Sequence, residues 1–380
     1  MNMSRLRREP KKHYGHNQRE PDFLDLITLV CEIYHSYHGN LIPMQQFNRT
    51  WELEENAGHA CIVTTRSITS PHQSPSDRGE SKVSEEKVIV KRTKKPIFGT
   101  ESSAIHTLIN ELRIRSHPPL RGHPNIVDLK GIAWDFENSD DGEPIPLLVE
   151  EFAPHRALDT FWGVRDLVRM PLLVKADLCR DVAEGINALH ACGIAHGDIK
   201  PGNVLIFPNS KPTMGDKGRR FTAKLTDFGH SVCEFTKDPT LPIWTPMWSA
   251  PEANPDVPEG VCAQIQSFED ITATDVYSYG LVAVSIILGT AVVGGKFPEL
   301  ADTAAVSVMK LDDSMLDHIM EVVIREDRTH PDSDFDLGFI RALLRRCLRK
   351  QPSERSMLSC IEILKGYVAI HRVEFFVFAF

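Results

Sequence analysis

The feature that most constrains this chain is a short polar string near its middle, His196-Gly197-Asp198-Ile199-Lys200-Pro201-Gly202-Asn203. It places a carboxylate, an ammonium group and an amide within six residues, and the apolar run Val204-Leu205-Ile206-Phe207 follows at once. A lone aspartate with an asparagine five residues later would carry no information. The complete string, ending in a strand-like run, is specific.

Further segments occur in a fixed order around this string. Downstream come Leu225-Thr226-Asp227-Phe228-Gly229, Trp244-Thr245-Pro246-Met247-Trp248-Ser249-Ala250-Pro251-Glu252, Thr274-Asp275-Val276-Tyr277-Ser278-Tyr279-Gly280 and Pro352-Ser353-Glu354-Arg355. Upstream come Val88-Ile89-Val90-Lys91, Glu111 twenty residues after Lys91, His123-Pro124-Asn125-Ile126-Val127 and Glu150-Glu151-Phe152-Ala153. Taken singly, most of these would be solvated charges or turns.

In this combination the segments resemble the eukaryotic-type protein kinase family, in its Ser/Thr branch, over about Leu53 to Gly366. The resemblance implies an α+β, two-lobed fold: a small N-lobe with an antiparallel sheet and one helix, and a larger, mainly helical C-lobe. We expect a kinase domain at 48–370, with an N-lobe at about 48–152 and a C-lobe at about 153–370. Residues 1–47 would form an extension and residues 371–380 an apolar tail.

The resemblance also implies a role for each motif residue, because phosphoryl transfer needs positioning and charge neutralisation. Asp198 would be the catalytic base and Lys200 would steady the transferring phosphoryl group. Asn203 and Asp227 would bind Mg²⁺ through hard oxygen ligands. The ATP-binding residues would be Lys91 with its partner Glu111, the backbone of Glu151 and Ala153, Leu205 under the adenine, and Leu53 and Cys61 around the phosphate loop. Glu252 would pair with Arg355, and Asp275 would lie at the start of a buried central helix.

The hydrophobic pattern predicts the elements in outline. After a polar, basic start that is typical of disorder, a helix runs from Pro21 to about Gly39-Asn40. Short strands are predicted at Cys61–Val63, Val88–Val90, Ile126–Leu129 and Leu147–Val149, with a helix carrying Ile105, Leu108, Ile109 and Leu112. A Ser/Pro-rich stretch at about Thr65 to Ser84 is predicted to be a flexible loop. The chain after Leu158 is predicted to be mainly helical.

The chain departs from the family in several places. The glycine-rich segment Leu53 to Cys61 has only Gly58 as a glycine, and Glu54 and Glu55 add negative charge there. Ile89 stands where a small residue usually lies above adenine, and Arg115 stands where an apolar side chain normally packs. Gly197 replaces the arginine that reads a phosphate on the activation segment.

Composition limits the partners. The net charge is −9, which argues against nucleic acid. The eight cysteines form no CxxC pair, which favours reduced thiols in the cytoplasm or nucleus. No secretory signal opens the chain, and the apolar run Tyr279 to Val293 is interrupted, so we expect a core helix and no membrane association. Pairs such as His117 with His123 lack further ligands for a metal. Oligomeric state stays open.

The sequence is compatible with three functions. The leading one is transfer of the ATP γ-phosphate to a protein Ser or Thr, favoured over Tyr by Lys200 and Thr245. The second is a scaffold with a kinase fold and weak or no ATP binding, which the departures in the small lobe favour. The third is a small-molecule kinase, since His-Gly-Asp also occurs in kinases of the aminoglycoside and choline type.

Overall fold

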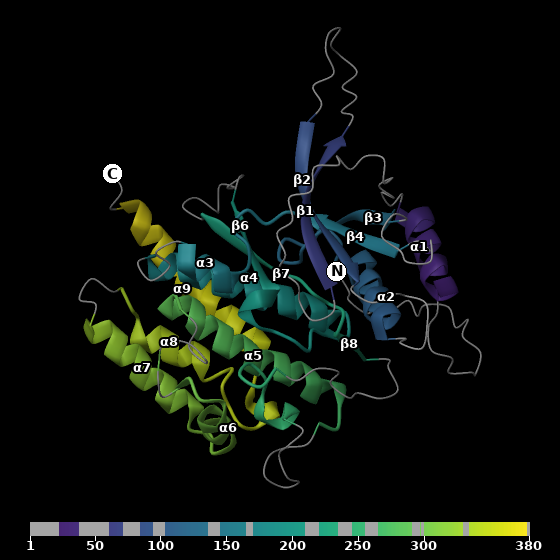
Figure 1. The fold of residues 1–380 in the computed structure, drawn as a ribbon. Coiled ribbons are helices and arrows are strands. Elements are labelled where there is room, and N and C mark those ends of the chain that lie inside the picture. The colour runs from purple at the N-terminus through teal and green to yellow at the C-terminus, as the bar shows by residue number, and fades with distance from the viewer. Residues whose placement is uncertain are drawn as a thin grey trace, which may run out of the picture.

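The structure, a computed structural model, describes residues 23–37, 61–70, 84–93, 103–135, 145–164, 170–209, 220–234, 245–254, 265–290, 297, 300–329 and 334–377. Two lobes of unequal size lie side by side, a small one with a sheet and a larger one built mainly from helices (Figure 1). The α+β, two-lobed fold expected from the sequence is therefore confirmed.

The small lobe is organised around a four-stranded antiparallel sheet. Its strands are β1 (Cys61–Ser70), β2 (Ser84–Thr93), β3 (Leu129–Asp135) and β4 (Ile145–Glu151), in the order β1-β2-β4-β3. Alternate residues of β2 and β4 face opposite sides of the sheet. Val88, Val90, Leu147 and Val149 form a core on one side with Ala133. The residues between them, Ile89, Lys91, Leu148 and Glu150, face the other side.

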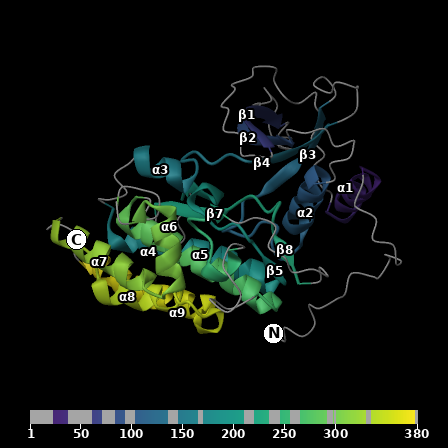
Figure 2. The same ribbon diagram turned by 60° about the horizontal axis from the view of Figure 1, so that its bottom comes forward.

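Two helices cover that second side. Helix α2 (Ser103–Ser116) packs on the sheet through the predicted apolar stripe, and α1 (Phe23–Tyr37) packs on the outer side of α2 (Figures 1 and 2). Leu26 and Val30 of α1 are buried in the same cluster as Ile109 and Leu112 of α2. Part of the N-terminal extension thus docks on the small lobe, within the bounds predicted for its helix.

Two predicted elements of this lobe have the wrong bounds. The stretch predicted to be a loop from Thr65 to Ser84 contributes to both strands of a hairpin, because β1 continues to Ser70, opposite Ser84. Its Ser and Thr residues give no apolar alternation, yet their backbone pairs fully. The strand predicted at Ile126–Leu129 is displaced: β3 begins at Leu129, while Val127 donates its backbone N–H to Leu225 O in the large lobe.

The large lobe contains helices and short strand pairs. Its helices are α3 (Leu158–Val164), α4 (Leu172–Ala191), α5 (Phe268–Leu288), α6 (Thr303–Leu311), α7 (Met315–Thr329), α8 (Leu337–Leu344) and α9 (Met357–Val377). The strands β5 (Ile194–Ala195) and β8 (Val232–Cys233) pair, as do β6 (Val204–Pro208) and β7 (Phe221–Leu225). Short 3₁₀ turns lie at η4 (Pro201–Asn203), η5 (Pro251–Ala253) and η7 (Pro352–Glu354).

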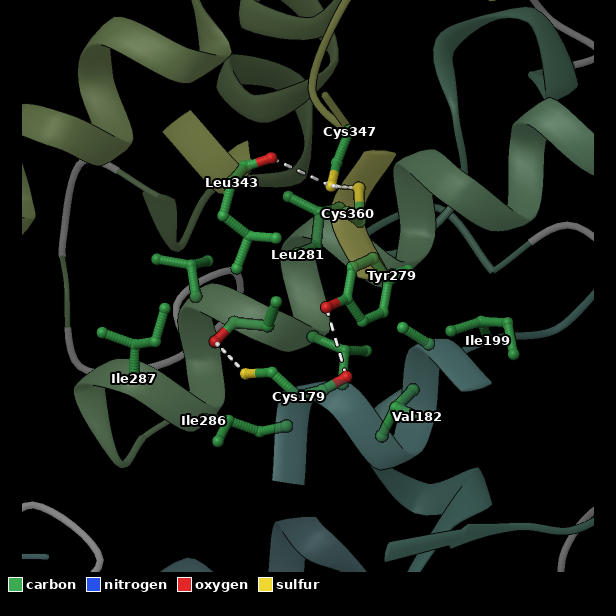
Figure 3. Close-up of a cluster of buried hydrophobic side chains, with 14 of the residues drawn as sticks. Cys179, Val182, Ile199, Tyr279, Leu281, Ile286, Ile287, Leu343, Cys347 and Cys360 are labelled. Atoms are coloured by element: carbon green, nitrogen blue, oxygen red, sulfur yellow. Dashed lines mark hydrogen bonds between the residues drawn. The ribbon is translucent and has the colours of Figure 1, made fainter. Parts of the chain in front are cut away.

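Helix α5 is the centre of this lobe. Ser267 and Asp270 form a capping box at its start, and Gly289, with φ +69°, ends it. Asp275 therefore lies two turns inside the helix, which corrects the expectation that it marks the start. Tyr279 of α5 donates its hydroxyl to Cys179 O of α4, and Cys347 and Cys360 meet beside it with their sulfurs 3.3 Å apart (Figure 3).

Length and composition alone would allow α5 to cross a membrane, but 94% of its most apolar window is buried inside the protein. This agrees with the core helix expected from the apolar run that begins at Tyr279. The C-terminal helix α9 continues to Val377, so most of the tail predicted at 371–380 belongs to a helix that begins at Met357. Residues 378–380 lie outside the described part.

Candidate active site

The polar groups that surround Asp198 in the sequence form a tight constellation in space. Lys200 Nζ lies 2.6 Å from Asp198 Oδ2, and Asn203 Nδ2 lies 2.8 Å from Asp198 O and 3.1 Å from Oδ2. Thr245, from a separate turn, donates its hydroxyl to Asp198 Oδ1 over 2.8 Å. Asp198 is 7% exposed, so three donors fix a nearly buried carboxylate.

Asp275 of α5 holds the backbone of the loop that carries Asp198. Its carboxylate accepts the N–H groups of His196 and Gly197 at 2.7 and 2.9 Å, and His190 Nε2 lies 2.9 Å away. Gly197 has φ +77°, and a Cβ there would lie 3.1 Å from His230 O. A glycine relieves both the left-handed strain and this close approach.

The segment after β7 brings Asp227 to the same place. Thr226 donates its N–H to Asn203 O, and Thr226 O lies 3.0 Å from His196 Nε2. Asp227 has φ +67°, an uncommon conformation for a residue with a Cβ. Asn110 of α2 supports the turn by donating to the carbonyls of Phe228, Gly229 and Ser231.

Lys91 connects the two lobes of the site. Its Nζ lies 2.8 Å from Glu111 Oε2 and 3.0 Å from Asp227 Oδ1. Burial raises the pKa of Glu111, against the lowering effect of Lys91. Burial would also raise the pKa of Asp227, but the charge and hydrogen bond of Lys91 outweigh it and lower that pKa to about 2. Asp227 therefore stays ionised at neutral pH.

The residues expected around adenine also lie together. Leu205 packs against the cluster formed by Val127, Ala153 and Phe207. The backbone N–H of Glu151 donates to Asp128 O, and its carboxylate accepts from Lys224 Nζ, 2.6 Å away. The carbonyl of Ala153 accepts from Arg156 N, which turns the chain into the large lobe. Of the two residues predicted around the phosphate loop, Cys61 opens β1, while Leu53 lies outside the described residues.

Comparison with known proteins matches these features to a family. The protein kinase domain family matches residues 77–366, most of the chain. The chain belongs to the eukaryotic-type protein kinases. It is 27% identical to the wall-associated receptor kinase-like 14 of Arabidopsis thaliana over 60% of its length, and 28% identical to the dual serine/threonine and tyrosine protein kinases of dog and human over 68%. It spans only 28% of the first relative and 23% of the other two.

The predicted ion pair between Glu252, at the end of the activation segment, and Arg355 is present in the kinase. Arg355 Nη2 lies 2.9 Å from Glu252 Oε2, and Nη1 contacts Oε1 in a second, parallel interaction. Both side chains are almost fully buried, and Arg355 also donates to the carbonyls of Ala273, Arg349 and Lys350. The pair fixes the end of the segment that carries Thr245 onto the large lobe.

The oxygen ligands of this kinase site fit a magnesium ion. Asn203 uses its Nδ2 on Asp198, so its Oδ1 is the atom that it offers to a cation. Asp227 gives one oxygen to Lys91, and its side chain is still 39% exposed. Among the described residues, no three or more His, Cys, Asp or Glu side chains form a group that could hold a metal ion by themselves. Mg²⁺ usually takes one or two protein ligands and completes its shell with phosphate and water, so this sparse set suits it.

Sequence reasoning missed three residues that shape the site. Glu150 is predicted only as part of the adenine-binding segment, but its side chain is buried against Arg115 of α2. Asn110 supports the turn after Asp227. Lys310 of α6 is 4% exposed and donates to three carbonyls of the turn that follows Thr245. Only Glu150 carried a signal, as a charge in the apolar run of β4.

A cavity of about 190 Å³ lies between α1, the end of α2 and β3. Val30, Tyr34, Arg121, Lys130 and Ile132 are among its lining residues. None of the groups around Asp198 contributes to it, and it is smaller than the pockets that usually hold a nucleotide-sized ligand. The groups around Asp198 and Lys91 therefore stay the candidate site.

Proposed function

We propose that this protein transfers the γ-phosphate of ATP to a Ser or Thr hydroxyl of a protein substrate, with Mg²⁺ as cofactor. The observation that carries the proposal is the joint arrangement at Asp198, where Lys200, Asn203 and Thr245 converge on one carboxylate. The same arrangement supports Ser/Thr as the acceptor, because Lys200 and Thr245 both contact Asp198. That the whole protein acts on protein substrates is likewise part of this proposal.

In this mechanism each group has one task. Asp198 orients the acceptor hydroxyl and receives its proton, and Lys200 neutralises charge on the phosphoryl group as it moves. Lys91, oriented by Glu111, holds the α- and β-phosphates. Asn203 and Asp227 would hold Mg²⁺, which neutralises charge on the phosphates when bound. Glu151, Ala153 and Leu205 would bind adenine.

The test is phosphate transfer from labelled ATP to a peptide library with Ser, Thr or Tyr as acceptor. We expect labelling of Ser and Thr peptides that Asp198→Asn removes. Asp317→Asn, the same chemical change at an exposed position of α7, should leave the rate unchanged. Absence of transfer by the wild type, or transfer that survives Asp198→Asn, would refute the proposal. ATP turnover without labelled peptide would favour a small-molecule acceptor.

A second candidate is a binding module that keeps the fold without turnover. It is favoured by Glu54 and Glu55 in the glycine-poor segment and by Ile89 in β2. A thermal shift with Mg-ATP separates the two candidates, because a ligand stabilises a protein by RT ln(1 + [L]/Kd). No shift at millimolar nucleotide would favour the binding module.

We also propose that the protein works in the cytoplasm or nucleus, without nucleic acid or membrane as partner. Cys179, Cys347 and Cys360 support a reducing compartment, because they are buried as free thiols. Finding the full-length protein in a secretory compartment by microscopy would contradict this.

A further inference from the structure

A pair of opposite charges is buried behind Lys91. Arg115 Nη1, from the last turn of α2, lies 2.8 Å from Glu150 Oε1 of β4. The two side chains are 0% and 5% exposed. Charged side chains are almost never buried so completely unless they are paired, so this contact needs a reason.

The guanidinium of Arg115 reaches three parts of the site at once. Besides Glu150, it lies within 3.9 Å of Glu111 Oε1 and 3.5 Å of Thr226 Oγ1. Its Cζ is 5.7 Å from the centre of the Phe228 ring, which packs in turn on His196. The Arg115 side chain thus contacts three things: strand β4, Glu111 (which pairs with Lys91), and the segment that carries Asp227.

The register of the sheet places Glu150 on the same face as Lys91. Lys91 pairs with Leu148 and Ile89 pairs with Glu150, and directly paired residues lie on one side of an antiparallel sheet. Burial alone would lower the pKa of Arg115, but Glu150 and Glu111 outweigh it and raise that pKa. The Arg115 side chain therefore keeps its positive charge although it is buried.

Stability does not explain the pair. Removing two ions from water costs more than most buried pairs recover, and an apolar pair of similar volume is often as stable or more so. Apolar side chains accept many apolar neighbours, however, whereas a buried guanidinium is tolerated only where its counter-charge lies close to it. The other described contacts of α2 with the sheet are the apolar ones through Leu108 and Leu112 and the ion pair of Glu111 with Lys91, which this pair would position.

We propose that Arg115 and Glu150 are positioning residues: their ion pair fixes α2 against β4, so that Glu111 holds Lys91 towards Asp227. The inference rests on the proposed phosphoryl transfer, since it assigns how Lys91 is oriented for that reaction. Arg115 then differs from the apolar residue that the family usually has at this position because an ion pair takes the place of apolar packing.

The test compares Arg115→Met, Glu150→Met and the double variant. Arg115→Met leaves the buried Glu150 without its counter-charge, and Glu150→Met leaves Arg115 only the longer, 3.9 Å contact with Glu111. We therefore expect the unfolding equilibrium constant to rise at least about 100-fold in each single variant, and the double variant to return to near the wild type. If the pair positions α2, kcat should stay at least about tenfold lower in the stable double variant. The peptide KM should change less than about twofold, because the proposed role acts on the orientation of Lys91 and not on Asp198, which would receive the acceptor hydroxyl.

Hydrogen exchange of the α2 amides gives a readout that does not depend on activity. We expect these amides to exchange faster in the double variant than in the wild type, with the α9 amides unchanged. Arg349→Met is the matched control, because Arg349 Nε lies 2.8 Å from Glu354 Oε2 in an exposed pair. It should change neither kcat nor exchange in α2.

The outcomes separate this proposal from the proposed function. A double variant with wild-type kcat and wild-type exchange in α2 would overturn the positioning role, even if the singles fail to fold. If the wild type transfers no phosphate, the exchange data decide alone: faster exchange in α2 supports the role of the pair, and unchanged exchange overturns it. Partial recovery of kcat by Arg115→Lys, relative to Arg115→Met, would support it further.

Discussion

The hydroxyl of Thr245 and the carboxylate of Asp198 form a 2.8 Å hydrogen bond across 47 residues of sequence. The bond connects the end of the activation segment to the proposed base, and Asp198 is nearly buried. A hydrogen bond to a charged group contributes about 1.5–3 kcal/mol. If it orients Asp198 in the transition state, Thr245→Val should lower kcat about 10- to 100-fold.

Thr245→Ser keeps the hydroxyl and is the matched control. It should retain most of the rate, since only a methyl group is lost. Steady-state kinetics with a Ser or Thr peptide would check both variants. Equal rates in the Val and Ser variants would mean that the hydroxyl does not orient Asp198.

The ion pair of Lys91 with Asp227 predicts a pH effect. Because Lys91 lowers the pKa of Asp227 to about 2, from 3.8 for the free side chain, this group adds stability above about pH 4 that disappears as the pH falls towards 2. Lys91→Met removes the cation that outweighs the effect of burial on Asp227. The pKa of Asp227 should then rise above 3.8, so that protonation would stabilise the folded variant on acidification.

Carbon-detected NMR titration of the Asp227 carboxyl, together with urea unfolding between about pH 3 and 7, would measure this. Lys365→Met, which loses an exposed pair with Glu184, serves as the control and should leave the titration unchanged. An Asp227 pKa that stays near 2 in Lys91→Met would show that another group holds the charge.

The sequence predicts the parts of the site that lie in motifs of fixed spacing. Lys91 with Glu111, and Glu252 with Arg355, are paired correctly because each residue belongs to a motif whose place in the fold is set. The partner of Arg115 could not be found in this way. Its choice of Glu150 depends on how α2 sits on β4, which is decided by packing across the sheet.

The strand errors have a similar cause. Ile126 and Val127 read as a strand because they are apolar, but they are buried where the small lobe meets β7 and bond to Leu225. The polar half of β1 gives the opposite error, since backbone pairing with β2 does not require apolar side chains. Tertiary context overrides local pattern in both places.

Breaking the pair of Glu252 with Arg355 should destabilise the large lobe strongly. Glu252→Gln leaves a fully buried guanidinium without its counter-charge, and breaking a buried pair costs about 3–5 kcal/mol. Urea unfolding would measure the loss. Glu354→Gln, in the exposed pair with Arg349, should cost less than about 1 kcal/mol. Similar costs for the two variants would contradict the assignment.

Lys310 predicts a second pH effect, in the alkaline range. Burial lowers the pKa of Lys310 to about 7, from 10.5 for the free side chain. The unfolded chain then binds more protons between pH 7 and 10.5, so the stability of the wild type relative to Lys310→Met should rise with pH there, by at most about 1.4 kcal/mol per pH unit. Below pH 7 the difference should be constant.

Paired urea titrations of the wild type and Lys310→Met at several pH values would isolate this group. The three carbonyls of Pro246, Met247 and Ser249 match the three donors of a protonated amine. A difference that stays flat up to about pH 10 would therefore mean that these bonds hold the proton and that burial does not lower the pKa.

Two helical glycines predict opposite effects of the same substitution. A Cβ on Gly280 of α5 would lie 2.6 Å from Cys347 Cβ and 2.8 Å from Leu348 Cδ2, and Cys347 Cβ cannot move without its backbone. Gly280→Ala should therefore force α5 away from its neighbours and cost about 1–3 kcal/mol.

Gly366 of α9 is exposed, and a Cβ added to it would meet nothing within 4 Å. Gly366→Ala should stabilise the protein by about 0.5–1 kcal/mol, because alanine loses less backbone entropy in a helix. Urea unfolding of both variants checks the pair, and destabilisation by Gly366→Ala would show that α9 does not pack as described.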